Sequence, residues 1–390
     1  MRRSGSAPVD TAPDGRPYLN SSQVHAWTKC RYQWHLGAIR HIGTFKVMRA
    51  PELGTFVHEG LAAGMRHAAI ERIPSKKKRR DRAQIVARAI DIATDTIAER
   101  RRSGIDLRGG IDGAAPEEVD ALLVIEAEAQ GIVRKHLHEI DFDRYDTLVV
   151  GNEPIIERAF TMRLPKAAGS YFGGYHGTVD WGVLDREVDA VFVADYKVRS
   201  SFNPPEAEEV NLQLAMYQRL LLANGIMTDG TLMFQIKAAA PREPELLKSG
   251  KALSRQDINT DWDTYLNVIT RHGFDPDDYL DMQQKLATKE WRRIERTYRS
   301  ETEVKAIWDQ IVLPAAAEIS DFMTNAGSVV AGKRRSWNHM TCQGCWARDF
   351  CVAELRNEDT EFLLETRFVD HDNPRQRVIL NPDNFVFVED

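Results

Sequence analysis

Apolar residues recur at helical spacing through the first part of the chain and then change to strand-like alternation. The helical part predicts helices over residues 20–36, 55–71, 81–102 and 116–140. Runs rich in β-branched and aromatic residues then predict strands of a mainly antiparallel or mixed sheet, over 148–150, 154–164, 175–184 and 188–198. The remaining pattern predicts a helix over 205–223, a strand over 231–237, mostly helical chain over 275–325 and a short strand over 385–388. This order predicts an α/β fold in which helices flank a sheet.

The changes of pattern also divide the chain into segments. They are a flexible leader over 1–17, N-terminal helices over 18–74, a helical insertion over 75–145, a core over 146–240, a mainly helical region over 241–335 and a C-terminal segment with a tail over 336–390. We expect the chemistry to lie in the core, where the strands gather.

The composition is that of a globular protein without a membrane span. Of the 390 residues, 43% are hydrophobic, and no window approaches the roughly 18 apolar residues that a span needs. Residues 1–17 lack the apolar core of a signal peptide, so we expect a cytoplasmic protein. The net charge of -6 argues against wholesale coating of nucleic acid and leaves room for a local basic channel. The basic run over 76–80 is either a solvated face or a DNA contact.

The cysteines point to a metal site that joins the two ends of the chain. Cys30 stands alone, whereas Cys342, Cys345 and Cys351 form C-x2-C-x5-C. In a reducing compartment, this pattern predicts one four-thiolate site. Zinc and an iron–sulfur cluster are both candidates, and the single C-x2-C pair favours a cluster. The alternative is a site made by the C-terminal trio with His339, in which Cys30 is only a buried helix residue.

The candidate catalytic groups lie in two short segments, 177–180 (GTVD) and 193–197 (VADYK). Strand alternation places Asp195 and Lys197 on one face and Tyr196 on the other. Lys197 is therefore suited to orient a nucleophilic water or to stabilise charge on a phosphate. The alternative is a surface hairpin whose Asp195/Lys197 ion pair contributes less than about 1 kcal/mol.

The hairpin register decides whether two carboxylates meet. If the hairpin closes through a four-residue loop over 186–189, Asp185 pairs with Ala190. Asp180 then lies opposite Asp195, with Cβ atoms about 5 Å apart. Two carboxylates at that distance repel each other and need a cation, and their hard oxygen ligands suit Mg²⁺ or Mn²⁺.

These residues resemble the PD-(D/E)XK nuclease superfamily, particularly its RecB-like branch with an iron–sulfur cluster. The resemblance implies a restriction-endonuclease-like nuclease core over 146–240, with Asp180 and Asp195-Tyr196-Lys197 as the core of the signature and Val179 in place of its proline. Gln213 and Tyr217, in QLAMY, resemble a Q-x-x-x-Y motif that follows the lysine. We expect this pair to position the substrate from one side of a helix.

The same resemblance implies two cofactors. His58, in GTFVHE, resembles the helical histidine that completes the metal site of this branch. The implied ligands of Mg²⁺ or Mn²⁺ are then His58, Asp180, Asp195 and the Tyr196 carbonyl.

The second implied cofactor is a 4Fe-4S cluster. Ser21-x8-Cys30, followed by Trp34, resembles the first ligand motif of that branch, and the C-terminal trio resembles the last. The implied cluster would join the N- and C-terminal segments through Cys30, Cys342, Cys345 and Cys351. We expect Trp27 and Trp34 to pack around it.

The resemblance implies a metal-dependent DNA exonuclease acting on single strands or duplex ends in recombination, repair, phage DNA metabolism or CRISPR adaptation. Proteins of recombination, replication or CRISPR adaptation are the expected partners, in the cytoplasm of a bacterial or phage-infected cell. Two alternatives remain, namely a DNA-end-binding or assembly subunit that needs partners and a restriction-type or structure-specific endonuclease. An intact Asp180, Asp195 and Lys197 set argues against a degenerate scaffold.

Overall fold

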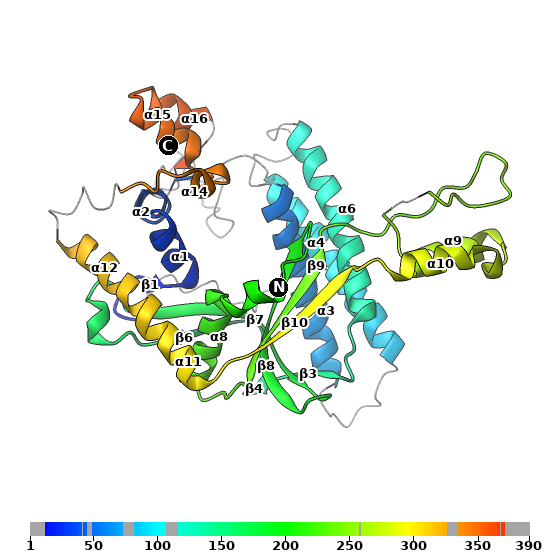
Figure 1. Cartoon of the computed structure of the whole chain (residues 1–390), viewed down its shortest axis with the longest axis horizontal. Coiled ribbons are helices and arrows are strands. Elements are labelled where there is room, and N and C mark those ends of the chain that lie inside the picture. Colours follow the sequence, from blue (N-terminus) through cyan, green and yellow to red (C-terminus); the bar gives the residue numbers. More distant parts are fainter. Residues whose placement is uncertain are drawn as a thin grey trace, which may run out of the picture.

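The computed structural model describes residues 12–40, 42–44, 49–72, 82–106, 116–256, 259–325, 334–366 and 368–370. Within these ranges the chain forms one mixed sheet between two layers of helices (Figure 1). The basic run over 76–80, the strand predicted over 385–388 and most of the leader lie outside the described residues.

The sheet is mixed because parallel and antiparallel pairs alternate across it. Its main order is β1 (Tyr18–Leu19), β7 (Gly174–Asp185), β8 (Ala190–Arg199), β9 (Gly230–Lys237) and β10 (Arg292–Tyr298). Two further strands, β3 (Tyr145–Thr147) and β6 (Ile156–Met162), pair antiparallel with β7. The pairs β1/β7 and β8/β9 are parallel, whereas β7/β8 and β9/β10 are antiparallel.

Each face of the sheet has its own hydrophobic core. Three long helices cover one face, namely α3 (Arg49–Arg72), α4 (Arg82–Asp106) and α6 (Pro116–Glu139). The other face packs against α1 (Ser21–Lys29), α8 (Leu212–Ala223), the π-helical turn η4 (Trp308–Val312) and α12 (Leu313–Thr324). The sheet residues alternate between the two cores, as the pleat of a strand requires: Phe192, Ala194 and Tyr196 enter the first core, and Val193 enters the second.

Two glycines of α3 allow close packing between the long helices. A Cβ atom on Gly60 would lie 2.7 Å from the side chain of Ile97 on α4. On Gly64 it would lie 2.9 Å from the carbonyl oxygen of Ala89, also on α4, and 2.8 Å from Leu137 on α6. Only the absence of side chains at these positions lets the three helices approach this closely.

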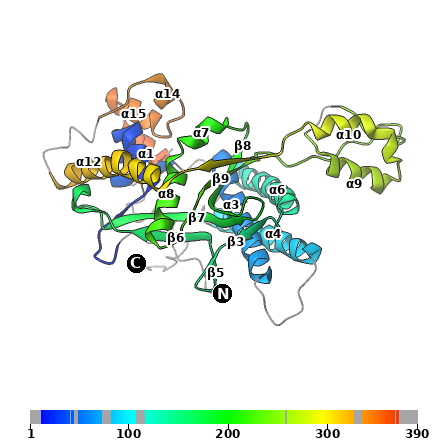
Figure 2. The same ribbon diagram turned by 60° about the horizontal axis from the view of Figure 1, so that its bottom comes forward.

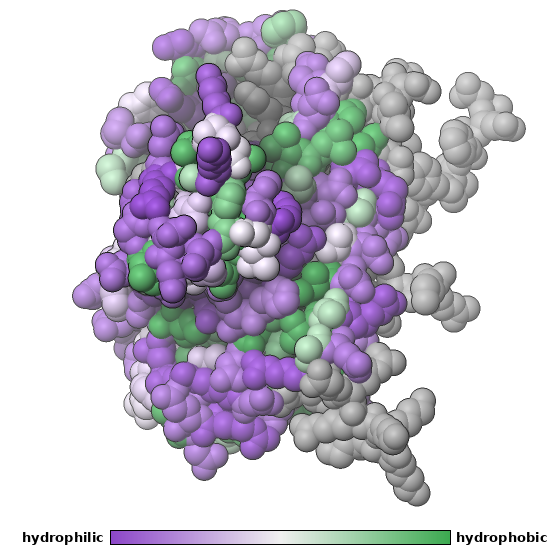
Figure 3. Space-filling view, turned by 90° about the vertical axis from the view of Figure 1, so that its right-hand side faces the viewer, coloured by the Kyte–Doolittle hydropathy of each residue, from purple (hydrophilic) through white to green (hydrophobic). Residues whose placement is uncertain are grey.

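The connection between β9 and β10 projects from the body of the molecule (Figure 2). It carries α9 (Trp262–His272), the 3-10 turn η3 (Pro276–Tyr279) and α10 (Leu280–Ala287). These elements enclose a small separate core that includes Tyr265, Tyr279 and Leu286. Seen from the side on which they project, the surface is mainly hydrophilic with scattered hydrophobic patches (Figure 3).

Shorter elements complete the fold. They are α2 (Arg31–Trp34), the π-helical turn η1 (His35–Ile39), β2 (Ile42–Thr44), β4 (Val149–Val150), β5 (Glu153–Pro154), η2 (Lys166–Ala168), α7 (Pro205–Glu209), α11 (Glu301–Ile307), α14 (His339–Gln343), α15 (Arg348–Leu355), α16 (Thr360–Thr366) and β11 (Phe368–Asp370). β11 pairs with β2, so the C-terminal segment lies against the N-terminal one.

The structure corrects three sequence predictions. Part of the stretch predicted as mostly helical, 275–325, is the strand β10, which pairs with β9 at the edge of the sheet. The prediction missed this strand because its Arg- and Glu-rich sequence carries no apolar strand signal. The helix predicted over 205–223 is broken at Asn211, which is the N-cap of α8 and whose side-chain oxygen accepts from the backbone N–H of Leu214 over 3.2 Å. The helix predicted over 20–36 is interrupted at Cys30, whose backbone is extended.

Several boundaries also differ from the prediction. The helix predicted over 55–71 begins earlier, at Arg49, because Pro51 lies within its first turn, where a missing N–H costs nothing.

None of the described helices is both long enough and apolar enough to cross a membrane.

We predict that Gly64→Ala destabilises the protein by about 1–3 kcal/mol, because the new methyl group meets the Ala89 backbone, which cannot move aside. Gly54→Ala on the same helix is the matched control. Apart from its chain neighbours and the backbone of its own helix, no described atom lies within 4 Å of the Cβ position of Gly54, so this change should stabilise the helix by up to about 1 kcal/mol. Urea unfolding of both variants measures the difference, and equal effects would contradict the packing described for α3.

Candidate active site

The β7/β8 hairpin has the register expected from the sequence. Asp185 pairs with Ala190 across a four-residue turn, and Trp181 pairs with Ala194. The next positions along the two strands are Asp180 and Asp195, and the Asp180 carboxylate accepts from the backbone N–H of Tyr196 over 3.2 Å. The hairpin therefore brings the two carboxylates together, as predicted.

An irregularity in the sheet marks this position. Val179 packs into the core on the α8 side and Trp181 into the core on the α3 side, although residues two apart on a regular strand share a face. On the neighbouring strand β6, Glu157 has a φ of 45°, in the left-handed region that non-glycine residues rarely adopt. Strain of this kind gathers at functional sites, because surrounding contacts must maintain it.

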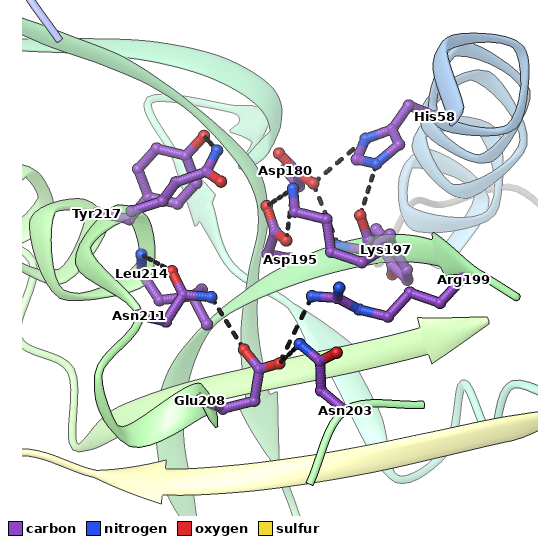
Figure 4. A network of polar contacts seen from close by, with 12 residues as sticks. His58, Asp180, Asp195, Lys197, Arg199, Asn203, Glu208, Asn211, Leu214 and Tyr217 are labelled. Carbon is purple, nitrogen blue, oxygen red and sulfur yellow. Dashed lines mark hydrogen bonds and ion pairs between the residues drawn. The ribbon is translucent and has the colours of Figure 1, made fainter. Parts of the chain in front are cut away.

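His58 reaches the carboxylates from the helical layer. It lies on α3, and its Nε2 donates to the Tyr196 carbonyl over 2.6 Å. Its Nδ1 lies 3.3 Å from Asp180 Oδ2 and 3.4 Å from Glu157 Oε1. The imidazole thus connects the helix to three strands, β6, β7 and β8. Figure 4 shows its contact with Asp180.

Burial and mutual repulsion make the carboxylates reluctant to ionise. Asp195 is fully buried and Asp180 is 6% exposed. Burial, reinforced by the Asp180 charge, raises the pKa of Asp195 to about 7. Burial also raises the pKa of Asp180, although the His58 charge opposes this rise. A cation between these side chains would remove the repulsion.

Lys197 is paired with the second carboxylate. Its Nζ lies 3.0 Å from Asp195 Oδ1 and 2.8 Å from Oδ2. Burial alone would lower the pKa of Lys197, but the charges of Asp195 and Asp180 outweigh burial and raise it. Lys197 therefore stays protonated at neutral pH and acts as a cation and hydrogen-bond donor.

Gln213 and Tyr217 form a hydrogen-bonded pair on α8. Gln213 Nε2 donates to Tyr217 Oη over 2.6 Å. Burial raises the pKa of Tyr217 well above its usual value, and the nearby Asp180 and Asp195 charges raise it further, so the phenol stays neutral. The ring packs against β7 at Gly177, where a Cβ atom would come within 3.1 Å of it. The pair therefore faces the carboxylates, as one helical turn of separation predicts.

Glu157 is a site residue that sequence reasoning missed. One carboxylate oxygen of Glu157, one ring nitrogen of His58 and one carboxylate oxygen of Asp180 all lie within 4.8 Å of one another. Nothing in the residues around Glu157 distinguishes this acidic residue from others on predicted strands. The pairing of Arg158 with Val179 places Glu157 opposite Asp180. Predicting this position from sequence would require the register of a third strand, β6.

The donor set fits a hard divalent cation. His58, Glu157 and Asp180 converge, and the Tyr196 carbonyl accepts from the histidine. The Asp180 carboxylate lies close enough to Asp195 to raise the pKa of Asp195. Carboxylate, carbonyl and imidazole ligands suit Mg²⁺ or Mn²⁺. The acidic group that the resemblance did not include, Glu157, adds a third carboxylate to this set.

The four cysteines line a second candidate site. They border one cavity of about 580 Å³, together with Arg335 and His339. All four carry free thiols, and Arg335 Nε lies 3.2 Å from Cys351 Sγ. Burial raises the pKa values of Cys345 and Cys351, and in both cases the charges of the neighbouring cysteines add to the rise.

The tryptophans expected around the cysteines lie elsewhere. Trp27 and Trp34 contact each other edge-to-face at 5.0 Å and pack against Phe322 of α12. They belong to the sheet core on the α8 side, and neither lines the cysteine cavity.

A comparison with known protein families finds a match that covers most of the chain. The sequence model described as PD-(D/E)XK nuclease superfamily matches residues 18–352. This range includes His58, the β7/β8 hairpin, α8 and all the cysteines. No curated protein matches the chain.

We predict that the affinity of the site for Mn²⁺ rises as the pH passes from about 7 to about 9. Metal must displace protons, and Asp195 retains its proton up to about 7. Burial would lower the pKa of His58, but Asp180 and Glu157 outweigh it and raise the pKa to about 9. Calorimetric titration with Mn²⁺ across this range measures the effect.

The matched variant for this prediction is His58→Gln. Its affinity for Mn²⁺ should still rise near pH 7, where Asp195 loses its proton, but should no longer rise towards pH 9. An affinity that does not change with pH would contradict the proton competition.

We further predict that Gln213→Ala and Tyr217→Phe slow cleavage of DNA without lowering the melting temperature by more than about a degree or two. Both changes remove the Gln213–Tyr217 hydrogen bond and keep the packed ring. Tyr217→Ala should also destabilise the fold by about 3–5 kcal/mol, because the ring is only 6% exposed. Equal losses of melting temperature in Gln213→Ala and Tyr217→Ala would contradict this separation of roles.

Proposed function

Because the chain belongs to the PD-(D/E)XK nuclease superfamily, we propose that it is a Mg²⁺- or Mn²⁺-dependent deoxyribonuclease of the RecB-like branch. The observation that carries the proposal is the pair of buried carboxylates, Asp180 and Asp195, beside a charged Lys197. Two buried carboxylates this close repel each other, and a bound cation would remove that cost.

The residues divide the work of phosphodiester hydrolysis between them. His58, Asp180, Asp195 and the Tyr196 carbonyl are the proposed ligands, with Glu157 beside them. When bound, the cation would polarise a phosphate oxygen and lower the pKa of a water molecule. Lys197, held by Asp195, donates hydrogen bonds to the phosphate where charge develops.

Gln213 and Tyr217 have a positioning role in this proposal. Their hydrogen bond fixes the Gln213 carboxamide at the start of α8, next to the carboxylates. The neutral phenol of Tyr217 adds no charge to the site. The pair would therefore orient the DNA strand and leave the metal chemistry to the hairpin.

We propose that the substrate is DNA with ends, single-stranded or duplex, and that the enzyme is an exonuclease of recombination, repair or phage DNA metabolism. The support is the resemblance to RecB-like enzymes, including those of CRISPR adaptation. Proteins of recombination, replication or CRISPR adaptation are the proposed partners, in the cytoplasm. A DNA-end-binding subunit and a restriction-type or structure-specific endonuclease are the alternatives, and the same experiment separates all three.

We also propose that Cys30, Cys342, Cys345 and Cys351 hold a 4Fe-4S cluster. Two observations support it. The four thiols border one cavity, and Cys30 enters it from a break between α1 and α2. Four thiolates are also the usual ligand set of such a cluster. Its role in this proposal is to hold the C-terminal segment against the N-terminal helices.

We predict that the purified protein degrades linear DNA in the presence of Mg²⁺ or Mn²⁺ and is inactive with EDTA. Lys197→Ala should lose about 100- to 1000-fold in kcat, because it removes a donor to the developing charge. Lys305→Ala is the matched control, since this exposed lysine of α11 pairs with Asp309 of η4 and is not one of the proposed site residues. Its activity should equal that of the wild type. End-labelled strands and covalently closed circles are assayed in parallel.

The outcomes distinguish the alternatives. Rapid linearisation of closed circles would replace the exonuclease with an endonuclease. Tight binding of ends with no cleavage under any metal condition would instead support the end-binding subunit. Full activity in Lys197→Ala would refute the proposed catalytic site.

For the cluster, we predict that anaerobically purified protein is brown and contains about four irons per chain. Cys30→Ser should lower solubility and melting temperature first and activity only as a consequence. Ligation closes a loop of more than 300 residues, for which the chain-entropy model of a crosslink gives an upper guide of about 5 kcal/mol. One equivalent of zinc and no iron, even after anaerobic reconstitution, would contradict the cluster and leave the nuclease proposal standing.

A further inference from the structure

A second cation follows Lys197 along the same face of β8. Strand alternation places Asp195, Lys197 and Arg199 on one face, where successive residues of this set are about 7 Å apart along the strand. The Arg199 side chain is 28% exposed, whereas the Asp195 side chain is fully buried. In Figure 4 the Arg199 guanidinium lies between Lys197 and Glu208. The active-site face therefore continues beyond the proposed metal ligands with a partly exposed guanidinium.

Arg199 is held by a buried carboxylate. Its Nη2 lies 3.6 Å from Oε1 of Glu208, a residue of α7 that is 1% exposed. The other oxygen of Glu208 accepts from Asn211 Nδ2 over 2.9 Å. Asn211 is the N-cap of α8, the helix that carries Gln213. Glu208 thus ties the orientation of Arg199 to the helix that faces the carboxylates.

The loop after β8 is fixed as well. Gln235 of β9, which pairs with Lys197, is fully buried. Its side chain accepts from the backbone N–H of Asn203 over 2.6 Å and donates to the Asn203 carbonyl over 3.2 Å. Arg199 therefore stands on a rigid support, as a preorganised binding group requires.

The charges of the two cations are balanced differently. Lys197 contacts both oxygens of Asp195 within 3.0 Å. Arg199 has one carboxylate contact, with Glu208 at 3.6 Å, and the other oxygen of Glu208 accepts a hydrogen bond from Asn211. A guanidinium carries five N–H donors in a planar fork that matches the oxygens of a phosphate. An anion on the exposed side of Arg199 would complete the arrangement.

We infer that Arg199 forms a second phosphate subsite, which binds the phosphodiester next to the one that is cleaved on the same DNA strand. Glu208 is its positioning residue. The inference rests on the proposed nuclease function. It adds a group that binds the DNA backbone and does not touch the reacting atoms. If Arg199 only supports the fold through its ion pair, the phosphate beside the scissile one has no special importance.

The wild-type protein tests this inference directly. A series of end-labelled single strands carries one neutral methylphosphonate, moved one position at a time from the cleaved bond. We expect kcat/KM to fall about tenfold or more when the neutral group is next to the scissile phosphate, and little when it is several positions away. An equal effect at all positions would overturn the inference.

Variants then assign the effect to Arg199. Arg199→Gln should cleave unmodified DNA about tenfold more slowly, through KM, and lose the sensitivity to the adjacent methylphosphonate; its salt slope should fall by about one. Arg199→Lys should regain part of both. Arg271→Gln is the control and should behave as the wild type; it removes an exposed arginine of α9 that pairs with Glu243.

The remaining outcomes separate this inference from the proposed function. If Arg199→Gln retains the methylphosphonate sensitivity and loses only melting temperature, Arg199 is structural and the inference fails while the nuclease stands. If the wild type cleaves no DNA with any divalent metal, the proposed function fails and the inference fails with it.

Discussion

Two carboxylates on adjacent strands, buried and close enough to repel, are the constraint on which the rest of the structure depends. Asp180 is 6% exposed, Asp195 is fully buried, and neither ionises easily without a cation. The surrounding groups compensate for this cost. Lys197 pairs with one carboxylate and His58 approaches the other, so the site contains opposite charges before any metal binds.

The two helical layers serve this site in different ways. The α3 layer supplies His58, and the small residues Gly60 and Gly64 let that helix pack closely on α4 and α6 beneath it. The α8 layer supplies the Gln213–Tyr217 pair and, through Glu208, the support of Arg199. The α3 layer therefore supplies one proposed metal ligand, the α8 layer supplies groups proposed to hold DNA, and the strands between them supply the carboxylates, Lys197 and Arg199.

The hairpin could be predicted from sequence because a four-residue turn and strand alternation are local rules. They place Asp185 opposite Ala190 and bring Asp180 to Asp195, as the structure confirms. Three features depend on distant contacts and escaped prediction. The strand β10 has an Arg-rich sequence that becomes a strand only by pairing with β9. Glu157 reaches the site only through the register of β6 and a left-handed φ of 45°. The extended backbone at Cys30 has no signal in a continuous apolar pattern.

The stability of Asp195→Asn, compared with the wild type with and without Mg²⁺, tests the central claim most directly. At a pH above about 7, where the Asp195 carboxylate must ionise, the metal-free variant should melt at least as high as the wild type, because it removes the repulsion between two buried carboxylates and leaves the Asp180 charge to pair with Lys197. Mg²⁺ should then raise the melting temperature of the wild type and leave the variant unchanged, which reverses their order. A metal-free wild type that is clearly more stable than Asp195→Asn and does not respond to Mg²⁺ would show that the carboxylates serve the fold and hold no cation.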